Sequence, residues 1–197
     1  PCGFYWTEGV RGLGWAVNAV PTLKGGSTLG IASPPAVRLP SGEIVTPGLP
    51  DAERLQGFDP DWAAPATQAV GVRTGHRWRL VGNAVSVRMA TWVGHRVNNQ
   101  IDYTADHETP LEPGDPWPTA AWGSHRKAFR VHESQWPVHD PYEDLGGFLD
   151  DSRLLSARAT AGFLRRARSG SLRFLPGFLD DVENHLDRMG GFPQAAA

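Results

Sequence analysis

The chain has 197 residues, of which 40% are hydrophobic and 20% charged with a net charge of -2, a composition typical of a globular protein with one real core or two small ones. The single cysteine excludes an internal disulfide framework and indicates a reducing cytosol, and the 23 glycines and 17 prolines predict many loops. No apolar run approaches the roughly 20 residues that span a bilayer and no signal peptide is visible, so we expect no membrane partner.

The first 45 residues predict a small β-rich domain. Short apolar segments separated by glycine-rich turns are typical of strands. We expect four strands, over residues 4–6, 15–17, 20–23 and 36–39. A hairpin turn at residues 41–43 would connect the last of them to a fifth strand over residues 44–46. The first hundred residues carry a net positive charge, which suits phosphate contact but is also common on an ordinary solvated surface.

Residues 46–100 show a helix, loop, helix pattern. The sequence predicts a short amphipathic helix that ends at Gly57, because glycine is favoured just after the last turn. A loop follows, and residues 76–79 are predicted to be extended and basic. The pair Gly82 and Asn83 is then expected to open a long helix with an apolar face.

The second half of the chain predicts a linker and a helical extension. Residues 101–123 are rich in proline, and we expect no regular structure there. Residues 124–197 predict helices over 152–168 and 172–189, each stopped by glycine. We expect this helical extension to pack on the rest of the protein or on a partner. The arginines near residue 168 are interpreted as a solvated helix C-terminus rather than a nucleic-acid contact. All these elements together predict an α+β fold.

Five short motifs follow one another in an informative order. They are Pro-Thr-Leu at residues 21–23, Gly-Gly-Ser at 25–27, Thr-Pro at 46–47, Arg-Leu-Gln-Gly-Phe at 54–58 and Gly-Asn-Ala-Val at 82–85. This order resembles the C-terminal end of DNA (cytosine-5) methyltransferases, over roughly the first half of the chain. The family usually has glutamate where this chain has Asp51 and proline where it has Asp59.

The resemblance implies a fragment of an α/β methyltransferase that uses S-adenosyl-L-methionine and acts on double-stranded DNA. Residues 1–45 would be the end of its target recognition domain, and residues 46–100 the C-terminal segment of its catalytic domain. Such enzymes flip the target cytosine out of the duplex, add a cysteine thiolate to C6 and transfer a methyl group to C5. The expected location is a bacterial cytoplasm, at the nucleoid.

Several motifs of the family's catalytic half are absent from the sequence, among them the glycine-rich cofactor loop and the Pro-Pro-Cys-Gln loop. We therefore expect the chain alone to be inactive and to need an N-terminal catalytic half, on the same chain or on a separate subunit. The sequence begins with Pro1 rather than methionine, and we expect it to be a fragment or a processed piece of a longer protein. Cys2 follows a proline, as the family's nucleophile does, but the surrounding motif is missing. We expect Cys2 to be an inert small hydrophobe, and we assign no catalytic residue.

The resemblance also implies DNA contacts in two glycine-rich loops that would enter the major groove, where glycines permit close approach to base edges. The residues implied are Arg11, Thr22, Lys24, Gly25, Gly26 and Ser27. A plain β-turn remains the alternative for these loops.

A second set of residues would close the cofactor site. Free backbone N–H groups at the start of a helix could bind the carboxylate of the cofactor's methionine end. The residues implied are Gly82, Asn83, Ala84 and Val85. Simple helix capping by asparagine stays open. A structural role is implied for Arg54, Gln56, Gly57 and Phe58, with Arg54 bracing the recognition domain against the catalytic domain.

Two other classes of function stay open. One is a non-catalytic specificity subunit of a split methyltransferase, which would support methyl transfer only when mixed with its catalytic partner. The other is an unrelated binding module for carbohydrate or peptide, suggested by eight tryptophans and many loops, which would have no affinity for duplex DNA. A metal site is not expected, because the histidines lack ligand spacing.

Overall fold

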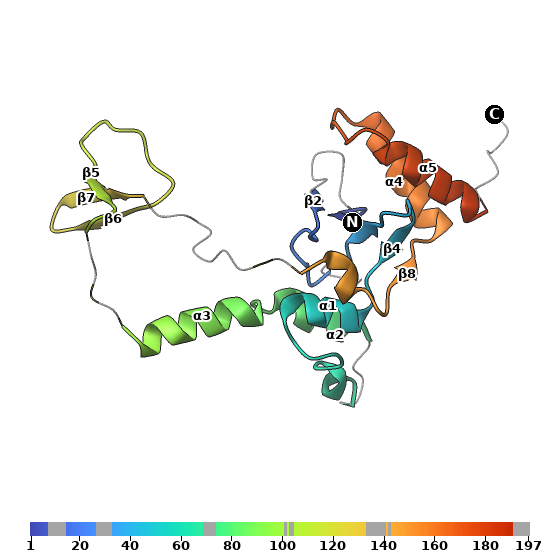
Figure 1. Cartoon of the computed structure of the whole chain (residues 1–197), viewed down its shortest axis with the longest axis horizontal. Coiled ribbons are helices and arrows are strands. Elements are labelled where there is room, and N and C mark those ends of the chain that lie inside the picture. Colours follow the sequence, from blue (N-terminus) through green and yellow to red (C-terminus); the bar gives the residue numbers. More distant parts are fainter. Residues whose placement is uncertain are drawn as a thin grey trace. The chain divides into compact units, whose positions relative to one another are not determined.

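The computed structural model describes residues 1–7, 15–26, 33–68, 74–100, 102, 105–132, 141 and 143–190. The chain divides into two compact units, one formed by Pro1–Thr91 with Glu143–Ala197 and the other by Trp92–Tyr142. Helices and antiparallel sheets occur together, which confirms the expected α+β class (Figure 1).

The first unit is built on a five-stranded antiparallel sheet with the order β2-β1-β3-β4-β8. Its strands are β1 (Cys2–Phe4), β2 (Trp15–Val17), β3 (Ala36–Arg38), β4 (Ile44–Thr46) and β8 (Arg153–Leu154). The hairpin turn expected between β3 and β4 is confirmed: Val37 pairs with Val45, and Gly42 has a φ of +79° that favours glycine.

The strand expected over residues 20–23 is not formed. Pro21 removes a backbone donor from this segment. The carbonyls that a neighbouring strand would use are bound by side chains instead: the Tyr5 hydroxyl donates to the carbonyl of Thr22, and Trp78 Nε1 donates to the carbonyl of Lys24 over 2.8 Å. The segment is therefore a loop held by tertiary hydrogen bonds.

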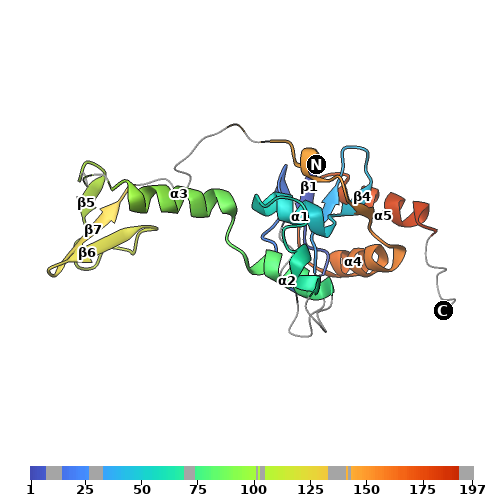
Figure 2. The same ribbon diagram turned by 90° about the horizontal axis from the view of Figure 1, so that it is seen from below.

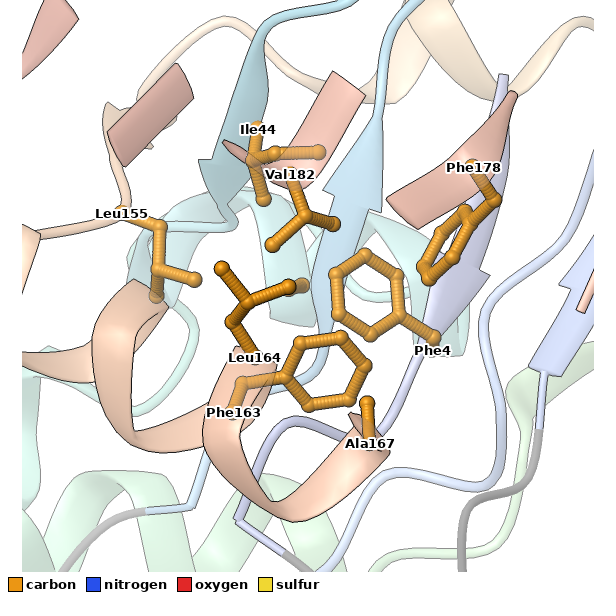
Figure 3. Packing of buried hydrophobic residues seen from close by; sticks show 9 residues of the cluster. Phe4, Ile44, Leu155, Phe163, Leu164, Ala167, Phe178 and Val182 are labelled. Carbon is orange, nitrogen blue, oxygen red and sulfur yellow. The ribbon is translucent and has the colours of Figure 1, made fainter. Parts of the chain in front are cut away.

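Two antiparallel helices, α4 (Ala157–Ser169) and α5 (Phe178–Arg188), cover one face of this sheet. Phe4 and Ile44 of the sheet pack against Phe163, Phe178 and other side chains from these helices (Figure 3). The ring centroids of Phe4 and Phe163 lie 4.9 Å apart. This cluster is the main hydrophobic core of the unit.

The opposite face of the sheet presents Val37 and Val45, which pack against Leu145 of the short helix η2 (Leu145–Phe148). A buried histidine, His185, connects the sheet to the C-terminal helices. The backbone N–H of Ile44 donates to Nδ1 of His185 over 3.3 Å, and Nε2 of His185 donates to the carbonyl of Leu155 over 2.9 Å. Both ring nitrogens are thus satisfied inside the core.

The C-terminal helices lie in the same compact unit as the first strands and pack on their sheet. Residues 152–154, expected to open a helix, include strand β8. Helix α4 begins after Ser156, whose side chain accepts a hydrogen bond from the backbone of Ala159. Helix α5 begins after Gly177, which has a φ of +78°, so the predicted start at residue 172 was too early. The predicted helix ends near residues 169 and 189 are confirmed.

Three helices follow β4: α1 (Leu49–Gln56), the short η1 (Ala64–Gln68) and α2 (Thr74–Asn83). The predicted end of α1 is confirmed, since Gly57 has a φ of +87° and its N–H donates to Arg54. The N–H of Phe58 donates to the carbonyl of Glu53, which completes a Schellman motif. The ring of Phe58 stacks on Trp62 with centroids 4.1 Å apart.

Residues 76–79 are helical rather than extended, which corrects the prediction. Trp78 and Val81 are one turn apart and both are buried in a cluster with Leu23 and Ala52. Burial of this face stabilises α2 although its sequence lacks a simple helical pattern. Helices α1 and α2 lie beside each other, as Figure 2 shows.

Helix α3 (Val87–Asn98) follows α2 after a short turn. The division between the two units falls within α3, and the second unit contains a three-stranded antiparallel sheet of order β5-β7-β6. Its strands are β5 (Glu108–Pro110), β6 (Ala121–Ser124) and β7 (Lys127–Val131). Trp122 stacks on Phe129 across β6 and β7, with centroids 5.1 Å apart. The two turn residues between β6 and β7 both have positive φ, as in a type I′ hairpin.

This sheet corrects two expectations: residues 101–123 are not devoid of regular structure, and residues 124–197 are not purely helical. Pro110 is compatible with a strand here because β5 lies at the edge of the sheet, where a missing backbone donor is tolerated. Within the described residues, no helix is long and apolar enough to cross a membrane.

Candidate functional site

The loop over residues 20–26 packs directly on the C-terminal end of α2. A Cβ atom added to Gly82 would lie 2.3 Å from the backbone nitrogen of Gly25, and one added to Gly25 would lie 2.6 Å from Oδ1 of Asn83. Real Cβ atoms do not approach so closely. Gly82 therefore needs glycine, because its added Cβ would meet the backbone of residues 24–25, whereas a Cβ at position 25 would require the Asn83 side chain to move. The motif predicted to contact DNA and the motif predicted to face the cofactor therefore touch each other.

The same loop presents its polar side chains outwards. Leu23 is buried in the cluster with Trp78, whereas Thr22 and Lys24 on either side of it are exposed. The Lys24 ammonium lies 4.1 Å from the centroid of the Tyr5 ring, a cation–π contact that restricts where the lysine side chain can go. The loop is thus anchored by one apolar residue and displays one hydroxyl and one cation.

The Arg-Leu-Gln-Gly-Phe motif contacts the Gly-Asn-Ala-Val motif through Gln56. Its Nε2 donates to the carbonyls of Val81 and Ala84, over 3.2 and 3.5 Å. These carbonyls lie in the last turn of α2 and just after it, and that of Val81 also accepts the backbone N–H of Ala84 over 3.2 Å. A Cβ added to Gly57 would lie 3.2 Å from Cβ of Val87, so α1 also packs closely on the start of α3.

Arg54 links α1 to the segment just before β8. Its guanidinium pairs with Asp51 and lies 3.3 Å from Oδ2 of Asp151, and its Nε donates to the carbonyl of Phe148 over 3.4 Å. The fully buried carboxylate of Asp51 also accepts from the backbone of Asp151 and, as in a capping box, from that of Gly48. The contacts of Arg54 lie inside one unit, and bracing between two domains stays a prediction.

Glu53 is a buried site residue that the sequence analysis missed. It is fully buried, and its Oε1 accepts from the backbone of Ala63 over 3.0 Å and lies 3.4 Å from Nη2 of Arg77. Among the described residues, Oε2 has no hydrogen-bond partner. The sequence did indicate that Glu53 is buried, because Glu53 shares a helix face with the apolar residues Leu49 and Ala52. Its bonds hold the loop after α1 against α2.

The structure changes the local geometry expected of the cofactor motif. Gly82 and Asn83 are the last residues of α2 and do not open a helix. The next helix begins at Val87, where the N–H of Ala90 donates to the carbonyl of Ser86. The free N–H groups expected at residues 82 and 83 therefore belong instead to the first turn of α3. A backbone loop over residues 24–25 covers Gly82, whereas Asn83 and Val85 are exposed.

Cys2 is buried in strand β1, as expected for an inert residue, and is 5% exposed. Burial raises the pKa of its thiol above the ordinary value of 9.0. A backbone hydrogen bond with Ala16 and the positive charges of the N-terminus and Arg38 lower this pKa only partly. The thiol is therefore protonated at neutral pH, which is the opposite of what a nucleophile needs.

Two of the predicted DNA contacts, Arg11 and Ser27, lie outside the described residues. Gly26 lies at the end of the described part of its loop and has a φ of +95°. Among the described residues, no group of three or more histidine, cysteine, aspartate or glutamate side chains could hold a metal ion.

The similarity to known proteins points to one class, the Type II methyltransferases. One relative is the Type II methyltransferase M2.BsuMI of Bacillus subtilis (strain 168), which is 45% identical over 190 residues. The alignment covers 94% of this chain but 49% of the relative, so the chain spans about half the length of the protein it matches. No family model matches the chain, and no solved structure matches it significantly.

Proposed function

We propose that this chain is the C-terminal portion of a DNA (cytosine-5) methyltransferase of a restriction-modification system. The observation that carries the proposal is that the three motif groups meet in space. Gly25 touches Gly82, Gln56 binds the carbonyls at the end of α2, and Gly57 packs on the start of α3. The similarity to a Type II methyltransferase independently supports the coarser class, a methyltransferase of a restriction-modification system.

In this proposal the loop with Thr22 and Lys24 faces double-stranded DNA. Its exposed hydroxyl and ammonium groups are donors that suit phosphate oxygens and base edges. Gly25 and Gly26 would let the backbone approach the duplex closely. Because the loop is anchored on α2, DNA contact would be linked to the position of the turn that follows α2.

That turn would close the cofactor site. Asn83 offers an exposed amide, and Val85, 66% exposed, offers an apolar surface beside it. This pairing fits S-adenosyl-L-methionine, whose methionine end carries both charged groups and methylenes. The cofactor supplies the methyl group, and this chain's residues would hold its methionine end and exclude water.

Helix α3 offers a surface for the half of the enzyme that this chain does not contain. Met89, Val93 and Val97 follow at four-residue spacing and are 54%, 45% and 65% exposed. Such a stripe marks an interaction surface. The chain spans only about half of its relative, so we assign the stripe to the catalytic half, on the same or a separate polypeptide. A separate polypeptide corresponds to the specificity-subunit alternative.

The proposal is tested by reconstitution. The chain is purified alone and together with the catalytic half encoded upstream of it or in a neighbouring gene, and transfer of a labelled methyl group to duplex DNA is measured. We expect transfer only when both halves are present. A triple variant, Met89→Gln, Val93→Gln and Val97→Gln, should lose both association and transfer while the chain keeps its helical circular dichroism.

A matched control replaces exposed apolar residues elsewhere, Leu172→Gln and Leu175→Gln, and should leave association intact. Association that survives the triple variant would overturn the assignment of α3. Failure of duplex DNA to bind or to be methylated in the reconstituted pair would overturn the proposed function and favour an unrelated binding module.

A further inference from the structure

A second surface of the first unit lies apart from the motif cluster. A cavity of about 690 Å³ opens between Trp6 and one face of α4. Three arginines line it, Arg158, Arg165 and Arg166, beside small residues such as Gly162 that leave the space open. None of its lining residues is acidic.

The charge of this cavity is not neutralised by neighbouring side chains. Arg158 and Arg165 are exposed and, within the described part of the chain, neither forms an ion pair. They are seven residues apart, which places them on the same side of α4 and about 10 Å from each other along its axis. By contrast, Arg168 lies outside the cavity and pairs with Glu183 over 2.6 Å.

The floor of the cavity adds positive partial charge. Arg166 is held in place because its Nη2 donates to the carbonyl of Trp6. Among the described residues, Nε of Arg166 and Nε1 of Trp6 are buried donors without an acceptor. Buried donors that are not offset by acceptors favour an anion nearby.

We infer that this arginine face of α4 binds the phosphodiester backbone of duplex DNA, outside the motif cluster; this rests on the proposed function. One strand of a duplex carries a phosphate every 3.4 Å of its axis, so two arginines about 10 Å apart contact phosphates about three steps from each other. Phosphate contacts of this kind fix the register and orientation of a duplex on a protein.

The test compares two double variants of the full chain with equal change in charge. Arg158→Gln with Arg165→Gln removes the two cavity arginines, and Arg153→Gln with Arg173→Gln removes two exposed arginines outside the cavity. Binding of a fluorescent duplex of mixed sequence is measured at salt concentrations from about 50 to about 200 mM. Thermal unfolding of each variant checks that the fold is intact.

The cavity variant should bind about tenfold or more weakly at the lowest salt, and the slope of log K against log salt should fall by about 1.8, that of two phosphate contacts. The control variant should bind within about twofold of the unchanged chain. Equal losses in both variants, or no loss in the cavity variant, would overturn the inference alone. If the unchanged chain binds no duplex, alone or with its catalytic half, the proposed function fails as well.

Discussion

Gly25 and Gly82 show how single residues define the candidate site. The backbone of one occupies the space that a side chain on the other would need. The sequence identified both glycines through their motifs, but it could not show that they meet, because that contact joins segments more than fifty residues apart. Buried Glu53 was missed for a related reason: its partners, Ala63 and Arg77, become neighbours only when α2 packs on α1.

Gly82→Ala should destabilise the first unit, because the new methyl group would overlap the backbone of the loop. We expect a net loss of about 1–3 kcal/mol in the free energy of unfolding, even though alanine is the better helix former. Gly94→Ala in α3 is the matched control, since nothing lies within 4 Å of its added Cβ. It should be neutral or stabilise by up to about 1 kcal/mol. Equal shifts of both variants in denaturant unfolding would refute the close contact.

Cys2 leads to a prediction about pH. Burial raises the pKa of the Cys2 thiol in the folded chain above 9.0. As the pH rises, the thiol therefore loses its proton at a lower pH in the unfolded chain than in the folded chain. The thiol's contribution to stability is therefore complete below the unfolded pKa and is lost as the pH rises through the folded pKa. Labelling by a thiol reagent near pH 8 should be slower in the folded chain than in urea, because the buried thiol is protonated. Rapid labelling of the folded chain would contradict this account.

Among the helices and strands, the sequence predicted the position of each segment better than it predicted which segments pack against one another. The hairpin of β3 and β4 and the end of α1 follow from local rules for glycine and alternating residues, and both were predicted correctly. The start of α3 was placed too early, because the apolar pattern runs through the turn at residues 84–86 without a break. Strand β8 has two residues, too few for any pattern, and exists through its pairing with β4.

Gln56 connects α1 to α2, and its replacement tests that connection. Gln56→Ala removes the donors to the carbonyls of Val81 and Ala84, and we expect a loss of about 1–2 kcal/mol in stability. Gln68→Ala, at an exposed position in η1, should change stability by less than about 0.5 kcal/mol. If chemical denaturation shows the same midpoint for both variants, the two motifs are not coupled through Gln56.

In the molecule as a whole, the helical extension predicted after residue 124 contributes to the core of the first unit. Helices α4 and α5 pack against β1, β3 and β4, whereas the sequence left open whether the extension packs on the rest of the chain or on a partner. Long-range packing of this kind leaves no local signal, since Phe163 and Phe178 look like any apolar helix face. The fold class depends only on the mixture of elements, and it was predicted correctly.

If the proposed function holds, this chain completes an enzyme that methylates carbon 5 of cytosine. The identity of the methylated base tests this, and it is obtained by digesting duplex DNA to nucleosides after incubation with S-adenosyl-L-methionine and analysing them by mass spectrometry. We expect 5-methyl-2′-deoxycytidine when the chain and its catalytic half are both present and none when either is omitted. Methylation of an exocyclic amine, or formation of 5-methyl-2′-deoxycytidine without this chain, would contradict it.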